Sequence, residues 1–93
     1  MTIALLSIEL HLPVSQSLKD KRMVLRRLKD RLRPFNVSIA EVAHQDVWQR
    51  AGLGVVTVAT DDRSAEQTLT SVMREIERLE PGLVTRSEVE YLR

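Results

Sequence analysis

The sequence predicts an α+β fold of the ferredoxin-like class, a β-α-β-β-α-β sandwich whose four-stranded antiparallel sheet carries two helices on one face. Two observations predict it. Four segments are rich in β-branched or alternating apolar residues, and two others repeat apolar residues at spacings of three and four. Their order favours two right-handed β-α-β crossovers joined by a hairpin. We therefore expect a single domain over residues 1–93.

The first half of the pattern is a strand followed by a helix. Residues 3–12 alternate apolar and polar side chains, which is typical of a half-buried strand. Ser17 lies three residues before Asp20 and predicts the N-cap of a helix that stops near Pro34. One arc of that helix is apolar and predicts the face toward the core: Leu18, Leu25, Leu28 and Leu32.

The second half repeats the order with a hairpin in between. Asp61 and Asp62 are candidate caps for the second helix, which Glu80-Pro81-Gly82 should end. The first and third strands are the most continuously apolar and should be central, whereas charge on the second and fourth suits the sheet edges. Beyond the first helix the expected segments are a strand at 36–43, a polar connection at 44–50, a strand at 52–60 and a strand at 83–92.

Composition excludes several kinds of chemistry. The chain has no cysteine, which excludes disulfides, thiolate zinc sites and cysteine nucleophiles and is compatible with a reducing cytoplasm. The segment MTIALLSIELHL is too short to span a bilayer, so we read it as a strand of a soluble protein and expect no membrane partner. No catalytic constellation rises above chance. We therefore expect no enzymatic activity, no metal and no cofactor.

One segment carries most of the positive charge. Residues 17–33, SLKDKRMVLRRLKDRLR, hold eight of the fourteen Lys and Arg residues and two of the thirteen Asp and Glu residues. That is a net charge of +6, which leaves −5 for the rest of the chain. A concentrated basic element indicates a surface for a polyanion, of which nucleic acid is the commonest.

The cations of this helix form a stripe beside the apolar arc. Five of them recur at spacings of three and four: Lys19, Arg22, Arg26, Lys29 and Arg33. Such neighbours lie about 5–6 Å apart and can follow a phosphate backbone. The alternative is a solvated helix face, neutralised by Glu residues from elsewhere in the fold. Lys21 falls inside the apolar arc, and we expect it to point outward from the first turn in a structural role.

The connection HQDVWQRA, residues 44–51, gathers polar and aromatic side chains between two strands. His44 with Asp46 could supply a proton relay or a weak metal site, and Trp48 with Arg50 could stack on and pair with a nucleotide. The alternative is structural, with Trp48 folded back as a plug over the core. The residues alone leave these interpretations open.

Aromatic residues are scarce: Phe35, Trp48 and Tyr91. RNA-recognition modules of this fold stack bases on aromatics of the first and third strands. Here those strands read ALLSIEL and LGVVTVA and contain none, and Glu9, Glu88 and Glu90 would make the sheet face acidic. The sequence therefore argues against recognition on the sheet face and favours the helix and adjacent loops.

Three motifs resemble a known family: SLKDKR at 17–22, FNVSIAE at 35–41 and HQDVWQRA at 44–51. They resemble the YlxP-like family of small bacterial proteins, a domain of unknown function, over nearly the whole chain. The resemblance implies a ferredoxin-like fold and a bacterial cytoplasmic protein whose gene often lies among translation-initiation and ribosome-maturation factors. It implies no catalytic residues. Pro34 departs from the family pattern and should shorten the first helix.

Two functional hypotheses follow. The leading one is a non-enzymatic RNA- or ribosome-associated protein. Its nucleic-acid-binding residues would be Lys19, Arg22, Arg26, Lys29, Arg33, Trp48 and Arg50. The alternative is a homodimeric small-molecule-sensing or scaffold domain. Its two copies would pair through an apolar patch on the open sheet face: Ile3, Leu5, Leu53 and Val55.

Overall fold

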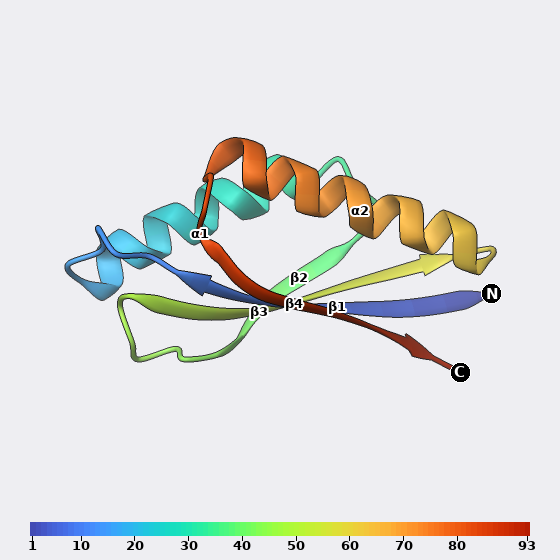
Figure 1. Cartoon of the computed structure of the whole chain (residues 1–93), viewed down its shortest axis with the longest axis horizontal. Helices are drawn as coiled ribbons and strands as arrows, with labels where there is room; N and C mark the ends of the chain where they lie inside the picture. The colour runs from blue at the N-terminus through green and yellow to red at the C-terminus, as the bar shows by residue number, and fades with distance from the viewer.

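The computed structural model describes all 93 residues and contains the expected order of elements (Figure 1). They are β1 (Thr2–His11), α1 (Leu18–Leu32), β2 (Ser38–Ala43), β3 (Arg50–Ala59), α2 (Asp62–Leu79) and β4 (Val84–Leu92). The third strand starts two residues earlier than the sequence suggests, because Arg50 and Ala51 pair with the end of β1. The predicted ferredoxin-like fold is confirmed.

The sheet has the order β2-β3-β1-β4, and every neighbouring pair is antiparallel. The two most apolar strands are central and the two charged strands form the edges, as predicted. Both helices cover the same face of the sheet and leave the other face open (Figure 1). The molecule is elongated along the strands, with extents of 41 × 22 × 18 Å.

Side-chain caps fix the start of each helix. Ser17 Oγ accepts a hydrogen bond from the backbone N–H of Asp20 at 3.0 Å, as its spacing predicts. Asp61, rather than Asp62, caps α2 and accepts from the N–H of Ser64 at 2.8 Å. At the other end of α2, Gly82 has a φ of 80°, which a residue without a Cβ adopts at no steric cost.

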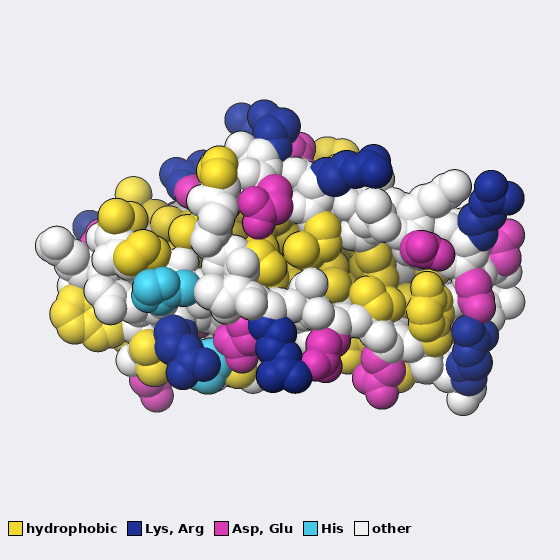
Figure 2. Space-filling view, in the orientation of Figure 1, with side chains coloured by type: hydrophobic (Ala, Val, Ile, Leu, Met, Phe, Trp, Pro, Cys, Tyr) yellow, Lys and Arg dark blue, Asp and Glu magenta, His cyan; other side chains and the backbone are white.

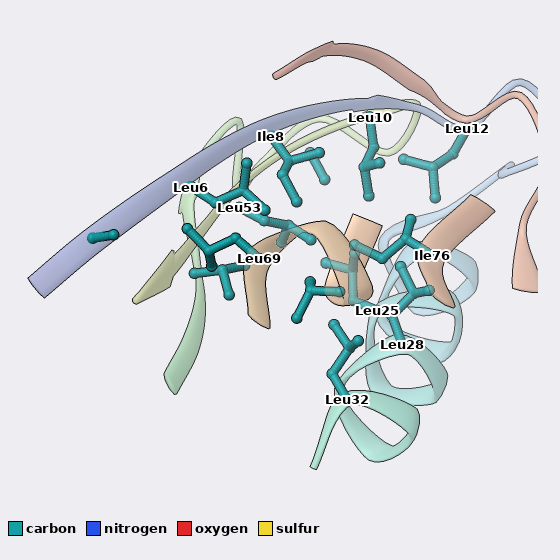
Figure 3. Packing of buried hydrophobic residues seen from close by; sticks show 14 of the residues in the cluster. Leu6, Ile8, Leu10, Leu12, Leu25, Leu28, Leu32, Leu53, Leu69 and Ile76 are labelled. Atoms are coloured by element: carbon teal, nitrogen blue, oxygen red, sulfur yellow. The ribbon is translucent and has the colours of Figure 1, made fainter. Parts of the chain in front are cut away.

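The core lies between the sheet and the helices and takes one row of side chains from each element (Figure 3). The even-numbered residues of β1 from Ala4 to Leu10 are all buried, and so is Leu12 just after the strand. Leu25, Leu28 and Leu32 of α1 face them, whereas Leu18 at the start of the helix is half-buried. Leu69, Val72 and Ile76 of α2 complete the cluster, and Figure 3 shows Leu69 and Ile76 beneath β1.

The register of β1 against β3 corrects the composition of the open face. Leu6 lies opposite Val55 and Ile8 opposite Leu53, so these four side chains share the face that the helices cover. Leu53 and Val55 are therefore core residues, and the prediction that they lie on the open face is wrong. The open face instead pairs Ile3 with Val58 and Leu5 with Val56. The run LGVVTVA has apolar residues at both its odd and its even positions, so the sequence could not reveal which of them face the helices.

A β-bulge positions the end of β2. The register between β2 and β3 shifts between Glu41 and Ala43, and Ala43 lies opposite Gly52. A Cβ added to Gly52 would lie 2.7 Å from the Cβ of Ala43, closer than real Cβ contacts. The glycine therefore permits the close approach of the two strands where the polar connection begins.

Candidate nucleic-acid interface

The basic stripe runs along the exposed side of α1. Its five members are all exposed: Lys19, Arg22, Arg26, Lys29 and Arg33. The apolar arc that faces the core fixes their orientation, because a helix places residues three and four apart on one side. The stripe covers most of the length of a helix of fifteen residues, about 22 Å.

Ion pairs separate the cations of α1 into two groups. Arg27 pairs with Glu80 at the end of α2, and Arg31 helps to keep the pKa of Glu75 low, although Arg78 is the main cause of that shift. Those cations therefore face α2 and its acids. Within the stripe, only Arg33 forms an ion pair, with Asp30 of its own helix at 2.8 Å.

The remaining four stripe residues, Lys19, Arg22, Arg26 and Lys29, form no ion pair within 4.0 Å. Acids from elsewhere in the fold neutralise the side of α1 that meets α2. They leave the opposite side of the helix unneutralised. This distribution favours a polyanion surface over a neutralised helix face.

Lys21 is the exception on α1, because its side chain is buried rather than turned outward. It is 1 % exposed. Its Nζ donates to the carbonyl oxygens of His44 at 2.8 Å, Gln45 at 3.2 Å and Arg50 at 3.3 Å. The same ammonium lies 2.8 Å from Oε2 of Glu41 on β2. The expected structural role is confirmed, but the expected outward orientation is wrong, because four oxygens surround the ammonium inside the fold.

The connection 44–49 turns sharply at His44. This residue has a φ of 63°, in the left-handed region where His is more frequent than most non-glycine residues. Its Nε2 lies 3.1 Å from Oε1 of Glu9 on β1, and Asp46 is exposed. The ring therefore pairs with Glu9 rather than Asp46, and the structure contains no cluster of three or more metal-ligating side chains.

Trp48 lies on the surface rather than over the core. Its side chain is 48 % exposed and belongs to no part of the buried cluster, so the interpretation as a plug is wrong. The backbone around it is held instead: Gln49 accepts from the N–H of Leu12 at 2.9 Å, and its Nε2 donates to the carbonyls of Pro13 and Ser15. A held backbone with an exposed indole is suitable for stacking on a base.

The structure brings only part of the predicted site together. Lys21 ties the connection between β2 and β3 to the first turns of α1, and both lie at the same end of the molecule (Figure 1). Arg33 lies twelve residues beyond Lys21, about 18 Å farther along the helix. Arg50 pairs with His11, whose side chain belongs to the row of the open sheet face. It therefore lies apart from the stripe.

The open sheet face carries both signs of charge rather than the acidic surface that the sequence suggests. Glu9, Glu88 and Glu90 all belong to its rows, together with Arg86. Figure 2 shows acidic and basic side chains interleaved along the lower rim of the sheet, and an apolar band between α2 and β4 above it. No aromatic residue lies on the open face, since Tyr91 is opposite Ala4 on the helix-covered side. Nothing there offers a stacking platform for RNA.

These features define an α+β sandwich of the ferredoxin-like class with a basic helix and a tethered polar connection. Two designed proteins share this architecture: the de novo designed protein Foldit4 and a de novo designed protein with a ferredoxin fold. Their TM-scores are 0.56 and 0.54 at 13 % and 11 % identity. Each alignment covers 99 % of this chain, with 96 % and 83 % of the designed chains. At such identities the likeness concerns the fold alone.

The sequence comparisons identify the family. Residues 3–89 match the family described as "Protein of unknown function (DUF503)", and the chain belongs to it. It is 40 % identical to "Uncharacterized protein YlxP" of Bacillus subtilis (strain 168), over 77 % of this chain and 82 % of that protein. The predicted YlxP-like membership is confirmed. Neither helix is long and apolar enough to cross a membrane.

Proposed function

We propose that this chain is a non-enzymatic RNA-binding protein of the ribosome or its assembly, and that α1 holds the phosphate backbone of the RNA. One observation carries the proposal. Arg27 and Arg31, which face α2, have acidic partners on it or at its end, whereas Lys19, Arg22, Arg26 and Lys29 are exposed and form no ion pair within 4.0 Å. Keeping like charges three and four residues apart disfavours the helix by a few tenths of a kcal/mol per pair. A bound polyanion would offset that repulsion.

The geometry suits contact with successive phosphates. Side chains three or four residues apart on a helix lie about 5–6 Å from each other, and lysine and arginine reach several ångströms beyond the helix surface. Each phosphate that a cation neutralises releases counterions and contributes roughly 0.7–0.9 to the salt slope. Four contacts therefore give a slope of about 3.

Trp48 would add a contact of another kind. An exposed indole on the connection that Lys21 ties to the start of α1 can stack on one unpaired base, and stacking of this kind tolerates any base. The stripe would then provide salt-dependent affinity, and Trp48 would provide a salt-independent contribution and a preference for single-stranded segments. Arg50 lies on the other side of the sheet end and would contribute less than the sequence suggests.

The test is a salt series with a charge-matched control. Binding of a labelled single-stranded fragment of ribosomal RNA is measured by fluorescence anisotropy between about 50 and 200 mM salt. In the test variant, Arg22, Arg26 and Lys29 are changed to Gln, which keeps good helix propensity. In the control, Arg63, Arg74 and Arg78 of α2 are changed to Gln, so both variants lose the same charge.

We expect the test variant to lose affinity and about two to three units of salt slope. The control should stay near the parent, because Arg78 is paired with Glu75 at 2.6 Å and α2 carries several acids. If both variants bind RNA as the parent does at every salt concentration, the stripe is a solvated face only. Equal losses in both would show that net charge, rather than the stripe, determines binding.

The second candidate function is the sensor or scaffold domain. A hollow of about 210 Å³ lies at the charged end of the open face, with Glu9, Gly52, Arg86 and Glu88 in its lining. Glu9 Oε2 is buried there without a hydrogen-bond partner. The hollow is smaller than the roughly 300–1,000 Å³ of most ligand pockets, so it supports this function less well. A sensor would show no salt-dependent RNA binding, and the same titration distinguishes the two functions.

A further inference from the structure

We propose that the open face of the sheet binds a second copy of this chain, and that the two sheets stack face to face about a two-fold axis parallel to their strands. This inference concerns the face opposite the helices and does not depend on RNA binding. The occupant follows from the residues of the face, the charges around them and the area available.

The open face has an apolar centre on the two central strands. Its members are Ile3, Leu5, Val56 and Val58, which form two cross-strand pairs. Val58 is 50 % exposed, and the other three are half-buried although nothing covers them. On β4, Leu92 lies next to Ile3 and is 47 % exposed. A contiguous apolar patch of this kind on a small domain indicates an interaction surface.

Charge is confined to β4 and to one end of the face. Glu88 lies opposite Ser7 and Glu90 opposite Leu5, both on the rows of the open face. The other edge strand, β2, presents neutral residues there, since Ser38 and Ala40 pair with Val56 and Gly54. Arg86 on the same row pairs with Glu88 at 2.5 Å, so Glu90 is the carboxylate of this edge that has no ion-pair partner. One edge of the face is therefore charged and the other neutral, and this asymmetry restricts how two copies can stack.

A two-fold axis parallel to the strands brings the two apolar centres together and keeps the charged edge strand of one copy away from that of the other. Because β1 and β3 are the central strands, such a rotation places β1 of one copy over β3 of the other at the same height. Leu5 then faces Val56 of the second copy, and Ile3 faces Val58. The charged strand β4 lies over β2 of the second copy, so Glu88 and Glu90 face Ala40 and Ser38. Sheets stacked in this way are twisted by about 30° and lie about 10 Å apart.

An axis across the strands fits the charge less well. Centred on the apolar patch, it would place β4 over β4 with its direction reversed, so Leu92 of each copy would face Glu90 of the other. A carboxylate buried against an apolar side chain without a partner is unfavourable. The charge on β4 therefore favours the first arrangement.

The area is enough for a weak but specific dimer. Three strands of nine or ten residues and one of six, about 4.8 Å apart, present roughly 550 Å² on each copy. Two copies would bury about 1,100 Å² in total, which is the size of weak, transient interfaces. We expect a dimer that dissociates on dilution in the micromolar range.

The arrangement leaves both basic stripes free. The helices lie on the opposite face of each sheet and would become the two outer layers of the dimer (Figure 1). Loss of the dimer would therefore leave the salt slope of RNA binding unchanged, and loss of RNA binding would leave the dimer intact. The two proposals can fail separately.

The test measures mass by size exclusion with light scattering from low to high micromolar concentration. The parent should approach twice 10.6 kDa as the concentration rises. Leu5→Glu and Val56→Lys should each stay monomeric, with dissociation constants raised at least about tenfold. Val58→Lys is a further variant, because a side chain that is half exposed tolerates the change without unfolding. Circular dichroism confirms that each variant is folded.

The control is Met23→Glu, an exposed apolar residue of α1 that lies outside the interface and should leave the mass unchanged. A mixture of Leu5→Glu with Val56→Lys distinguishes the two axes. With the axis parallel to the strands, the carboxylate introduced by Leu5→Glu in one chain faces the ammonium introduced by Val56→Lys in the other. The mixture then regains the dimer that each variant alone has lost. A monomeric parent at every concentration, a dimer that tolerates the single variants, or a mixture that stays monomeric would each overturn the proposal.

Discussion

The ammonium of Lys21 and the carboxylate of Glu41 lie 2.8 Å apart, between the first turn of α1 and the end of β2. Glu41 comes shortly before the sharp turn at His44, and the same ammonium binds the carbonyl of that residue. One buried cation thus neutralises an acid on the strand and satisfies the carbonyls of the connection that follows. This relationship fixes the conformation in which Trp48 is exposed.

Lys21→Met should destabilise the fold strongly. The change leaves three carbonyl oxygens and the partly buried Glu41 without their partner, which costs on the order of 3 kcal/mol. Urea denaturation measures this as a lower midpoint. Lys19→Met is the control, because Lys19 is exposed and should change stability by less than about 0.5 kcal/mol. Equal, small effects from both variants would show that the buried cluster contributes little.

Gly52→Ala should disturb the start of β3 through a single contact. The added methyl would lie 2.7 Å from the Cβ of Ala43, so a strand must shift, at a cost of about 1–3 kcal/mol. Combining it with Ala43→Gly removes the clash and should recover much of the loss. Gly54→Ala, whose nearest atom would be 3.4 Å away, is the matched control. Thermal unfolding distinguishes the three, and failure of the double variant to recover would contradict this reason.

Trp48→Ala should separate stacking from electrostatics. The side chain is half exposed and packs against no part of the core, so the melting temperature should change little. Affinity for single-stranded RNA should fall by about 1–3 kcal/mol, with an unchanged salt slope. Tyr91→Ala is the control for loss of an aromatic ring, because Tyr91 faces the helix-covered side. A fall in the salt slope for Trp48→Ala would show that the connection positions the stripe instead.

Asp62 should contribute to stability at neutral pH and lose that contribution in acid. The guanidinium of Arg93, 2.7 Å from its Oδ2, and then the hydroxyl of Thr2 hold the pKa of this carboxyl below its usual value. A folded-state pKa below the unfolded one stabilises the fold above the unfolded pKa of about 4, and the contribution is lost as pH falls through the folded pKa. Asp62→Asn should therefore have a lower melting temperature than the parent at neutral pH, and the gap between the two melting temperatures should narrow as the pH falls below about 4. A gap that stays the same at every pH would contradict this prediction.

The fold was predictable because its signals are local. Ser17 and Asp61 cap the helices at the expected positions, and the alternation of β1 correctly identifies the buried row from Ala4 to Leu12. The strand order follows from the connections and from where the charged strands are placed. The exposed stripe on α1 was also predictable, since helix periodicity alone assigns residues to its sides.

The parts that were wrong depend on contacts between distant segments. Lys21 is buried because its partners come from a connection more than twenty residues later, and helix periodicity alone cannot predict those contacts. Leu53 and Val55 were assigned to the wrong face because β3 is apolar in both phases, so only its register with β1 decides. The exposure of Trp48 follows from how the backbone on either side of it is tethered. No local pattern encodes such a tether.

The first and last strands are hydrogen-bonded neighbours, with Ile3 opposite Leu92, at the end of the molecule away from the connection 44–49 (Figure 1). A fluorophore or affinity tag attached beside Thr2 or Leu92 would therefore lie far from the connection that carries Trp48 and should not interfere with RNA titrations. The same attachment would lie beside the apolar pair Ile3 and Val58 on the open face. Tagged protein is thus suitable for measuring RNA affinity, whereas the mass measurement requires protein from which the tag has been cleaved.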